Sequence, residues 1–201
     1  MKIIQLSAAD TEKFGSKRVR KSDSKINARQ LNLFTEGRML KLHPLSPFEE
    51  AFMMDERDDR EAARKLYHKA IRTDDRPADA YCNLGILESQ DQQMTKAVDY
   101  LTLSLKLNPR HLEAHFNLAN LYADSGNRKL AKFHYEICIR IEPAFSNSYF
   151  NLGLTLAAEQ QYREAIDILS EYCRIAPCQE HKQALELIRK LQSMAAADKC
   201  G

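Results

Sequence analysis

The sequence lacks a long hydrophobic run: no apolar stretch among its 201 residues approaches the ~20 residues that a membrane-spanning helix needs. We therefore expect no contact with a membrane. The first residues, MKIIQLSAADTEK, hold a short apolar patch that is interrupted by Gln5 and Ser7 and followed by acidic residues, which is a poor match to a secretion signal. These absences predict a cytoplasmic protein.

A paired set of cysteines is also lacking. The chain has five, an odd number, and they are scattered through patterns typical of helices. Unpaired thiols of this kind are typical of a reducing compartment and do not form a disulfide framework. The cysteines are Cys82, Cys138, Cys173, Cys178 and Cys200.

Motifs for catalysis are missing as well. The sequence has no glycine-rich phosphate loop and no G-x-S-x-G, and its six histidines are spread along the chain. His111 and His115 have a metal-binding spacing for one helix, but His111 is expected to precede that helix. The spacing of Cys173 and Cys178 is not that of a zinc site. We expect no enzyme activity, metal site, cofactor or small-molecule substrate.

Positive charge is concentrated at the start of the chain. Eight Lys or Arg residues stand against three acidic residues in 1–29, whereas the whole chain has a net charge of only +2. With few bulky apolar groups, this segment is predicted to be a mobile basic tail. One basic cluster without interleaved aromatics is weak support for nucleic-acid binding, so we expect such contact only indirectly, through this arm.

The rest of the chain repeats itself every 34 residues. YCNLGILE begins at Tyr81, HFNLANLY at His115 and YFNLGLTL at Tyr149. Three further series keep the same interval, and their agreement is unlikely by chance. They are Ala97, Ala131 and Ala165; Leu101, Tyr135 and Leu169; and Pro109, Pro143 and Pro177.

This pattern resembles the tetratricopeptide repeat (TPR) family, which has the same period. The resemblance implies an all-α solenoid of about four helix-turn-helix units, and a closing proline should end each unit. The first unit is weaker, because Asp75 stands where the proline is expected. The predicted units are 44–77, 78–111, 112–145 and 146–179, within a domain at 44–195 that ends in a capping helix at 180–195 and precedes a tail at 196–201.

The first helix of each repeat should face the concave groove. Asn83, Asn117 and Asn151 recur there, and we call them the asparagine row. A side-chain amide both donates and accepts, so such a row can pair with a peptide backbone; alternatively, the amides bond a neighbouring helix. The other candidate groove residues are Phe48, Phe52, Ile86, Phe116, Asn120, Phe150 and Leu154, of which Phe116 and Phe150 are alternatively core residues.

Some TPR proteins use a clamp of lysines and arginines to hold the acidic end of a chaperone. The corresponding positions here have no such cation, and Glu113 would repel a carboxylate. We therefore predict that this chain does not bind chaperone tails. A peptide with apolar side chains or a basic flank fits the groove better. The positions are Phe48, Phe52, Asn83, Glu113 and Asn151.

Residues 30–43 allow different interpretations. Two short apolar runs flank a turn containing Gly37, which is typical of a β-hairpin. Alternatively, QLNLF is similar to the pentapeptide by which bacterial replication proteins dock on the DNA sliding clamp, with anchors among Gln30, Leu31, Leu33 and Phe34. The segment could also dock on its own repeats.

The sequence thus predicts a non-enzymatic scaffold that binds an extended peptide or a partner helix of another protein in the concave groove. The alternative function is a DNA-associated or regulatory adaptor. In that case the N-terminal arm would recognise a partner such as the sliding clamp.

Overall fold

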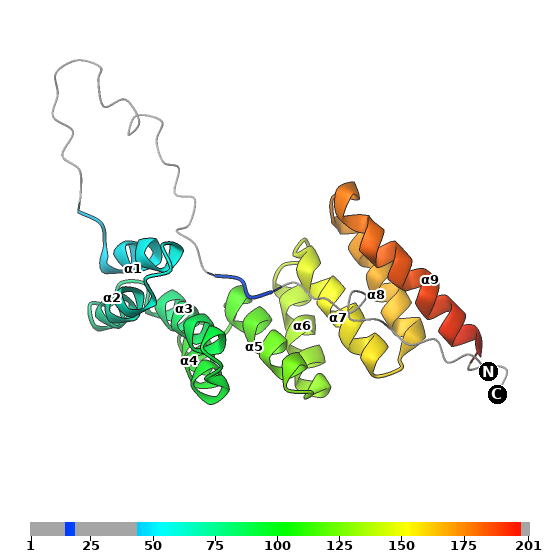
Figure 1. Ribbon diagram of the computed structural model, residues 1–201, viewed down its shortest axis with the longest axis horizontal. Helices are drawn as coiled ribbons and strands as arrows, with labels where there is room; N and C mark the ends of the chain where they lie inside the picture. The colour runs from blue at the N-terminus through cyan, green and yellow to red at the C-terminus, as the bar shows by residue number, and fades with distance from the viewer. Residues whose placement is uncertain (1–14, 19–43, 198–201) are drawn as a thin grey trace, which may run out of the picture. The chain divides into compact units, whose positions relative to one another are not determined.

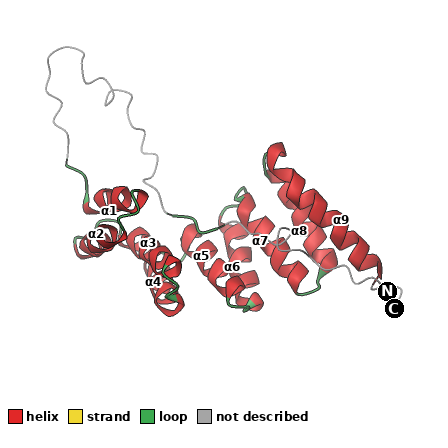
Figure 2. Cartoon of the chain, viewed as in Figure 1, coloured by secondary structure: helices red, strands yellow, loops and turns green. Residues whose placement is uncertain are grey.

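The computed structural model describes residues 15–18 and 44–197. These residues contain helices and turns but no strand (Figure 2), so the predicted all-α TPR fold is confirmed for them. The segment 30–43, with its predicted hairpin and its docking residues Gln30, Leu31, Leu33 and Phe34, lies outside the described residues. Most of the predicted basic tail and the end of the C-terminal tail also lie outside them.

The helices form two compact units (Figure 1). One unit contains Arg18 and four helices: α1 Pro47–Glu56, α2 Arg60–Arg72, α3 Pro77–Gln90 and α4 Met94–Leu107. The other unit contains residues 15–17 and the helices α5 Leu112–Asp124, α6 Arg128–Ile141, α7 Ser146–Ala158, α8 Tyr162–Ile175 and α9 His181–Ala197, with the 3-10 turn η3 Cys178–Glu180 before α9. Within each unit, every helix packs on its neighbours in sequence.

Side chains at the helix starts explain where several helices begin. Ser46 and Glu49 form a capping box at α1, and Asp59 and Asn127 accept main-chain hydrogen bonds at the starts of α2 and α6. These side chains satisfy N–H groups that have no partner inside the helix. His111 precedes α5 and accepts the Ala114 N–H at its Nδ1.

Two glycines allow the helices of a hairpin to approach closely. A Cβ at Gly85 would lie 2.7 Å from Leu101 Cγ, and one at Gly153 would lie 2.6 Å from Leu169 Cγ. Carbon atoms in contact are normally about 3.5–4.0 Å apart. The glycines of the repeat are therefore required by packing between α3 and α4 and between α7 and α8.

The turn inside each hairpin has the same backbone conformation. Asp58, Gln92, Gly126 and Gln160 follow each other at 34 residues, with φ of 60°, 60°, 79° and 62°. This left-handed conformation favours glycine, yet only one of the four is glycine. Asp58 belongs to the weakest repeat, so its turn matches the others although its sequence diverges.

Asp75, which replaces the expected proline, has a structural role. Its Oδ2 accepts the N–H of Phe48 at 2.7 Å, in the first turn of α1. The next residue, Arg76, places its guanidinium 4.3 Å from the centre of the Phe48 ring. The first repeat thus fastens its loop to α1 through a carboxylate and a cation–π contact.

None of the helices in the part of the chain that the structure describes is long and apolar enough to cross a membrane.

Candidate peptide-binding site

Asn117 of α5 holds a main-chain segment of the chain itself. Its Oδ1 accepts the N–H of Lys17 at 2.8 Å, and its Nδ2 donates to the carbonyl of Lys17 at 2.8 Å. Residues 15–18, which we call the arm segment, form neither helix nor strand. One buried amide therefore engages both main-chain groups of a single residue, and both bonds have good lengths.

The other members of the asparagine row donate to side chains of their own unit. Asn83 Nδ2 donates to the hydroxyl of Tyr67 at 3.0 Å. Asn151 Nδ2 donates at 2.9 Å to Asn120 Oδ1, which also accepts the hydroxyl of Tyr135 at 2.6 Å. These bonds match the alternative in which the amides bond a neighbouring helix, so peptide binding by Asn83 and Asn151 stays a prediction.

Asn151 also lines a pocket of about 180 Å³ in the α5–α9 unit. Its neighbours come from the end of α5, the start of α6 and the length of α7, and the predicted groove residue Leu154 is among them. The lining combines one amide, two charged groups, a hydroxyl and apolar groups. The lining residues are Ala123, Asp124, Arg128, Asn151, Leu154, Thr155 and Ala158.

The predicted groove aromatics are mostly core residues in this structure. Phe48, Phe116 and Phe150 are at most 2% exposed. Each packs against a tyrosine of the following helix, with ring centroids 5.7, 5.9 and 5.2 Å apart. Ile86 is equally buried, whereas Phe52 is half-buried. The core alternative thus describes Phe116 and Phe150, and Phe48, which was predicted only as a groove residue, is buried in the same way.

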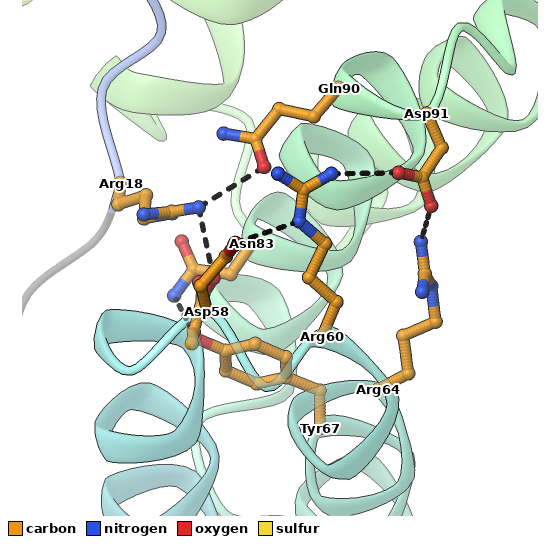
Figure 3. A network of polar contacts seen from close by, with 9 residues as sticks. Arg18, Asp58, Arg60, Arg64, Tyr67, Asn83, Gln90 and Asp91 are labelled. Atoms are coloured by element: carbon orange, nitrogen blue, oxygen red, sulfur yellow. Dashed lines mark hydrogen bonds and ion pairs between the residues drawn. The ribbon is translucent and has the colours of Figure 1, made fainter.

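The α1–α4 unit holds a second contact with the arm segment. Asp55, in the last turn of α1, is only 3% exposed. Arg18 Nη2 lies 2.9 Å from its Oδ1 and donates to Gln90 Oε1 at 3.2 Å. Tyr67 donates to the other carboxylate oxygen at 3.4 Å. Figure 3 shows the hydrogen bond that joins Arg18 to Gln90.

Burial controls the ionisation of this cluster. It raises the pKa of Asp55, and the nearby Arg18 charge partly opposes that effect. Burial also raises the pKa of Tyr67, helped by the negative charge of Asp55. A charge removed from water is costly unless it is paired. Arg18 therefore supplies the counter-charge that a buried, ionised Asp55 requires.

Neither Arg18 nor Asp55 is among the site residues predicted from the sequence, although the sequence carries a signal. Asp55 follows Phe48 and Ala51 at helical spacing, and both of these side chains are fully buried. An acid on that face, in the last turn where the helix dipole disfavours negative charge, is unusual. It could have indicated a buried carboxylate that needs a cation.

Two histidines, the buried His115 and the half-buried His134, lie close together in the other unit. His115 Nδ1 and His134 Nδ1 are 2.9 Å apart, and His115 Nε2 is 3.1 Å from the carbonyl oxygen of Pro109. Because that oxygen only accepts, His115 carries its hydrogen on Nε2, and His134 donates to His115 Nδ1. Within residues 15–18 and 44–197, no three His, Cys, Asp or Glu side chains are grouped to hold a metal.

Comparison with known proteins identifies the family. The Tetratricopeptide repeat family model matches residues 78–111, 112–145 and 146–177. The chain belongs to the tetratricopeptide repeat family. As a TPR protein, it has a fold that serves as a scaffold for protein interactions.

Similar proteins share the repeats. The human Protein O-mannosyl-transferase TMTC3 is 34% identical over 107 residues, which are 51% of this chain but 12% of that protein. The chain spans less than a fifth of the length of the curated relatives it matches.

Two solved structures show the same fold. A TPR protein from Parabacteroides merdae has a TM-score of 0.65 at 17% identity, over 75% of this chain and 59% of that one. The first TPR of Spaghetti (RPAP3), bound to an HSP90 peptide, has a TM-score of 0.56 at 18% identity, over 59% of this chain and 93% of that one.

Proposed function

We propose that this TPR protein is a non-enzymatic scaffold whose α5–α9 unit binds an extended peptide of another protein through the peptide main chain. The observation that carries the proposal is the pair of 2.8 Å bonds between the Asn117 amide and the N–H and carbonyl of Lys17. Main-chain groups are present in every peptide, so this contact holds a backbone in register whatever its side chains are.

The chemistry of the occupant indicates the kind of ligand. Lys17 and Arg18 are basic, whereas the TPR of Spaghetti is bound to an HSP90 peptide, SRMEEVD, that has three acidic residues among its last four. Asn117 is a neutral amide and needs no charge on its ligand. We therefore propose a basic or neutral segment as the partner, in agreement with the prediction against chaperone tails.

A receptor whose own arm segment cannot compete is needed for the test. We call the full chain with Lys17→Pro and Arg18→Ala the open receptor. Proline removes the N–H that Asn117 Oδ1 accepts, and alanine removes the guanidinium. The probe is a fluorescent synthetic peptide of residues 11–24, TEKFGSKRVRKSDS.

Adding Asn117→Ala to the open receptor should weaken probe binding about 5- to 150-fold, because two hydrogen bonds at ~0.5–1.5 kcal/mol each are lost. The matched control is Asn108→Ala, at an exposed asparagine, and it should leave the affinity for the probe unchanged. A probe with Lys17→Ala should bind like the parent, and one with Lys17→Pro should not. Equal affinity of the open receptor with and without Asn117→Ala would contradict the proposal.

A further inference from the structure

The surroundings of Asp55 carry an excess of negative charge. Four carboxylates, those of Asp55, Asp58, Glu88 and Asp91, gather where α1, α2 and α3 meet, as the ion pairs of this unit show. The helices supply two arginines there. Arg60 pairs with Asp58 and Asp91 (Figure 3), and Arg64 pairs with Glu88 and Asp91. Arg18 is thus the cation that pairs with Asp55 among the described residues.

Arg18 occupies the site with an imperfect fit. Its Nη2 is 2.9 Å from Asp55 Oδ1, but the angles are poor, and this oxygen accepts no well-aligned hydrogen bond from the described residues. Arg18 Nε is buried and has no hydrogen-bond partner among them either. A carboxylate can accept two parallel bonds from one guanidinium. The buried oxygen is therefore an acceptor that a better placed arginine could use fully.

The site is open on the side from which Arg18 arrives. The Arg18 side chain is 30% exposed, whereas that of Asp55 is 1% exposed. Gln90, which accepts from the same Nη2, is exposed. Arg18 thus covers Asp55 from the solvent side, so another cation could take its place without any rearrangement of the helices.

We propose that Asp55 and Gln90 form a recognition site for an arginine side chain of a partner peptide, and that Arg18 fills this site in cis until a partner displaces it. The inference rests on the proposed function and names the partner as an arginine-bearing segment. Arginine fits better than lysine because its planar fork can reach a carboxylate and an amide oxygen together. Because Arg18 is tethered, it competes at a high effective concentration.

The test compares two probes on the open receptor. Both are the 11–24 peptide with Arg20→Gln and Lys21→Gln, so that no other long cation can slip into the site. One keeps Arg18 and the other carries Arg18→Ala. We expect the arginine probe to bind about 10- to 100-fold more tightly, the range for a hydrogen bond to a charged group.

Asp55→Asn in the open receptor should reduce that ratio to about one. This variant keeps the shape of the side chain and removes the buried charge. The melting temperatures of the open receptor and of this variant show whether each is folded, and that of the variant should be at or above that of the open receptor. The wild-type chain should bind the arginine probe more weakly than the open receptor, because its own Arg18 competes.

The possible results separate the two proposals. A ratio of one on the folded open receptor, with binding of both probes still weakened by Asn117→Ala, overturns the arginine site alone. A high ratio that Asp55→Asn abolishes, with no effect of Asn117→Ala, overturns main-chain binding alone. Equal binding of the arginine probe by wild type and open receptor overturns the competition in cis and makes Arg18 a structural contact.

Discussion

The two units hold their polar groups in different ways. In α1–α4 the polar cluster is ionic, with carboxylates and arginines around Asp55. In α5–α9 it is neutral, with a hydroxyl and amides joined through Asn120, and Asn117 on the main chain of Lys17. The helical scaffold is similar in both, and each has a glycine that a leucine approaches closely.

This difference indicates how each unit would select a ligand. A neutral amide binds main-chain groups, which are the same in all peptides. This contact is little affected by salt. A buried carboxylate binds one type of side chain, a cationic one. The attraction between the two charges depends on ionic strength and pH. The two units therefore offer different kinds of selectivity, one for a main chain and one for a charged side chain.

The largest expected effect is that the stability of the two units depends differently on pH. In the α5–α9 unit this dependence comes from the histidines of α5 and α6. Burial lowers the pKa of His134 from 6.5 to about 4, and that of His115 is also lowered. The unfolded chain therefore binds protons at a higher pH than the folded one. The contribution of the neutral histidines to the free energy of unfolding is complete above about pH 6.5. Up to about 3 kcal/mol of it is lost as the pH falls to about 4.

Urea unfolding followed at several pH values would measure this loss. His134→Gln removes one of the two titrating histidines and should reduce the slope of the curve between pH 6.5 and 4, with helicity at pH 7 as the control. Asp55 should act in the opposite direction, because its pKa is raised: its contribution is largest at low pH and falls as the pH rises. Identical slopes for wild type and His134→Gln would disprove the role of the histidines.

The next effect tests what the units have in common. An alanine in place of a helical glycine normally stabilises by ~1 kcal/mol. At Gly85 and Gly153 the added carbon would meet Leu101 and Leu169 at 2.7 and 2.6 Å. Because overpacking costs ~1–3 kcal/mol, we expect both variants to lose about 1–2 kcal/mol in thermal or urea unfolding.

Shortening the leucine provides the control for this prediction. In a Leu169→Ala background, Gly153→Ala should cost less or become favourable, because the clash is gone. A stabilising Gly153→Ala in the otherwise unchanged chain would show that α7 and α8 can move apart. A loss at one glycine and not at the other would show that the two units differ in packing as well as in polar groups.

The sequence predicted the repeated features because each depends on a local requirement. Gly85 and Gly153 recur because two helices touch there, and the 34-residue period keeps such sites in register. The 34-residue period could not predict the hydrogen-bond partners of the asparagine row. Asn83 meets Tyr67, Asn151 meets Asn120, and Asn117 meets the arm segment, although all three occupy the same repeat position.

The ionic site could not be predicted for a different reason. Arg18 is 37 residues before Asp55 in a segment without periodicity, and only the tertiary fold brings the two together. The turn conformation was also hidden, because Asp58, Gln92 and Gln160 are polar residues that occur in many turns. Their positive φ became visible only in the structure.

The smallest effect concerns those turns, which we expect to respond alike in both units. Gln92 and Gln160 are exposed and left-handed, with φ of 60° and 62°. That conformation costs a residue with a side chain ~1–2 kcal/mol, and glycine returns part of the gain through its greater freedom when unfolded. Gln92→Gly and Gln160→Gly should therefore each stabilise by about 0.5 kcal/mol in urea unfolding.

Gly126, at the same position in the third repeat, provides the matched reverse change. Gly126→Ala has open space for its Cβ but keeps a φ of 79°, so it should lose about 1 kcal/mol from backbone strain alone. If Gln92→Gly stabilised the protein and Gln160→Gly did not, the turn in the α1–α4 unit would be more strained than the turn in the α5–α9 unit. If neither stabilised, contacts of the glutamine side chains would have to offset the strain in both units.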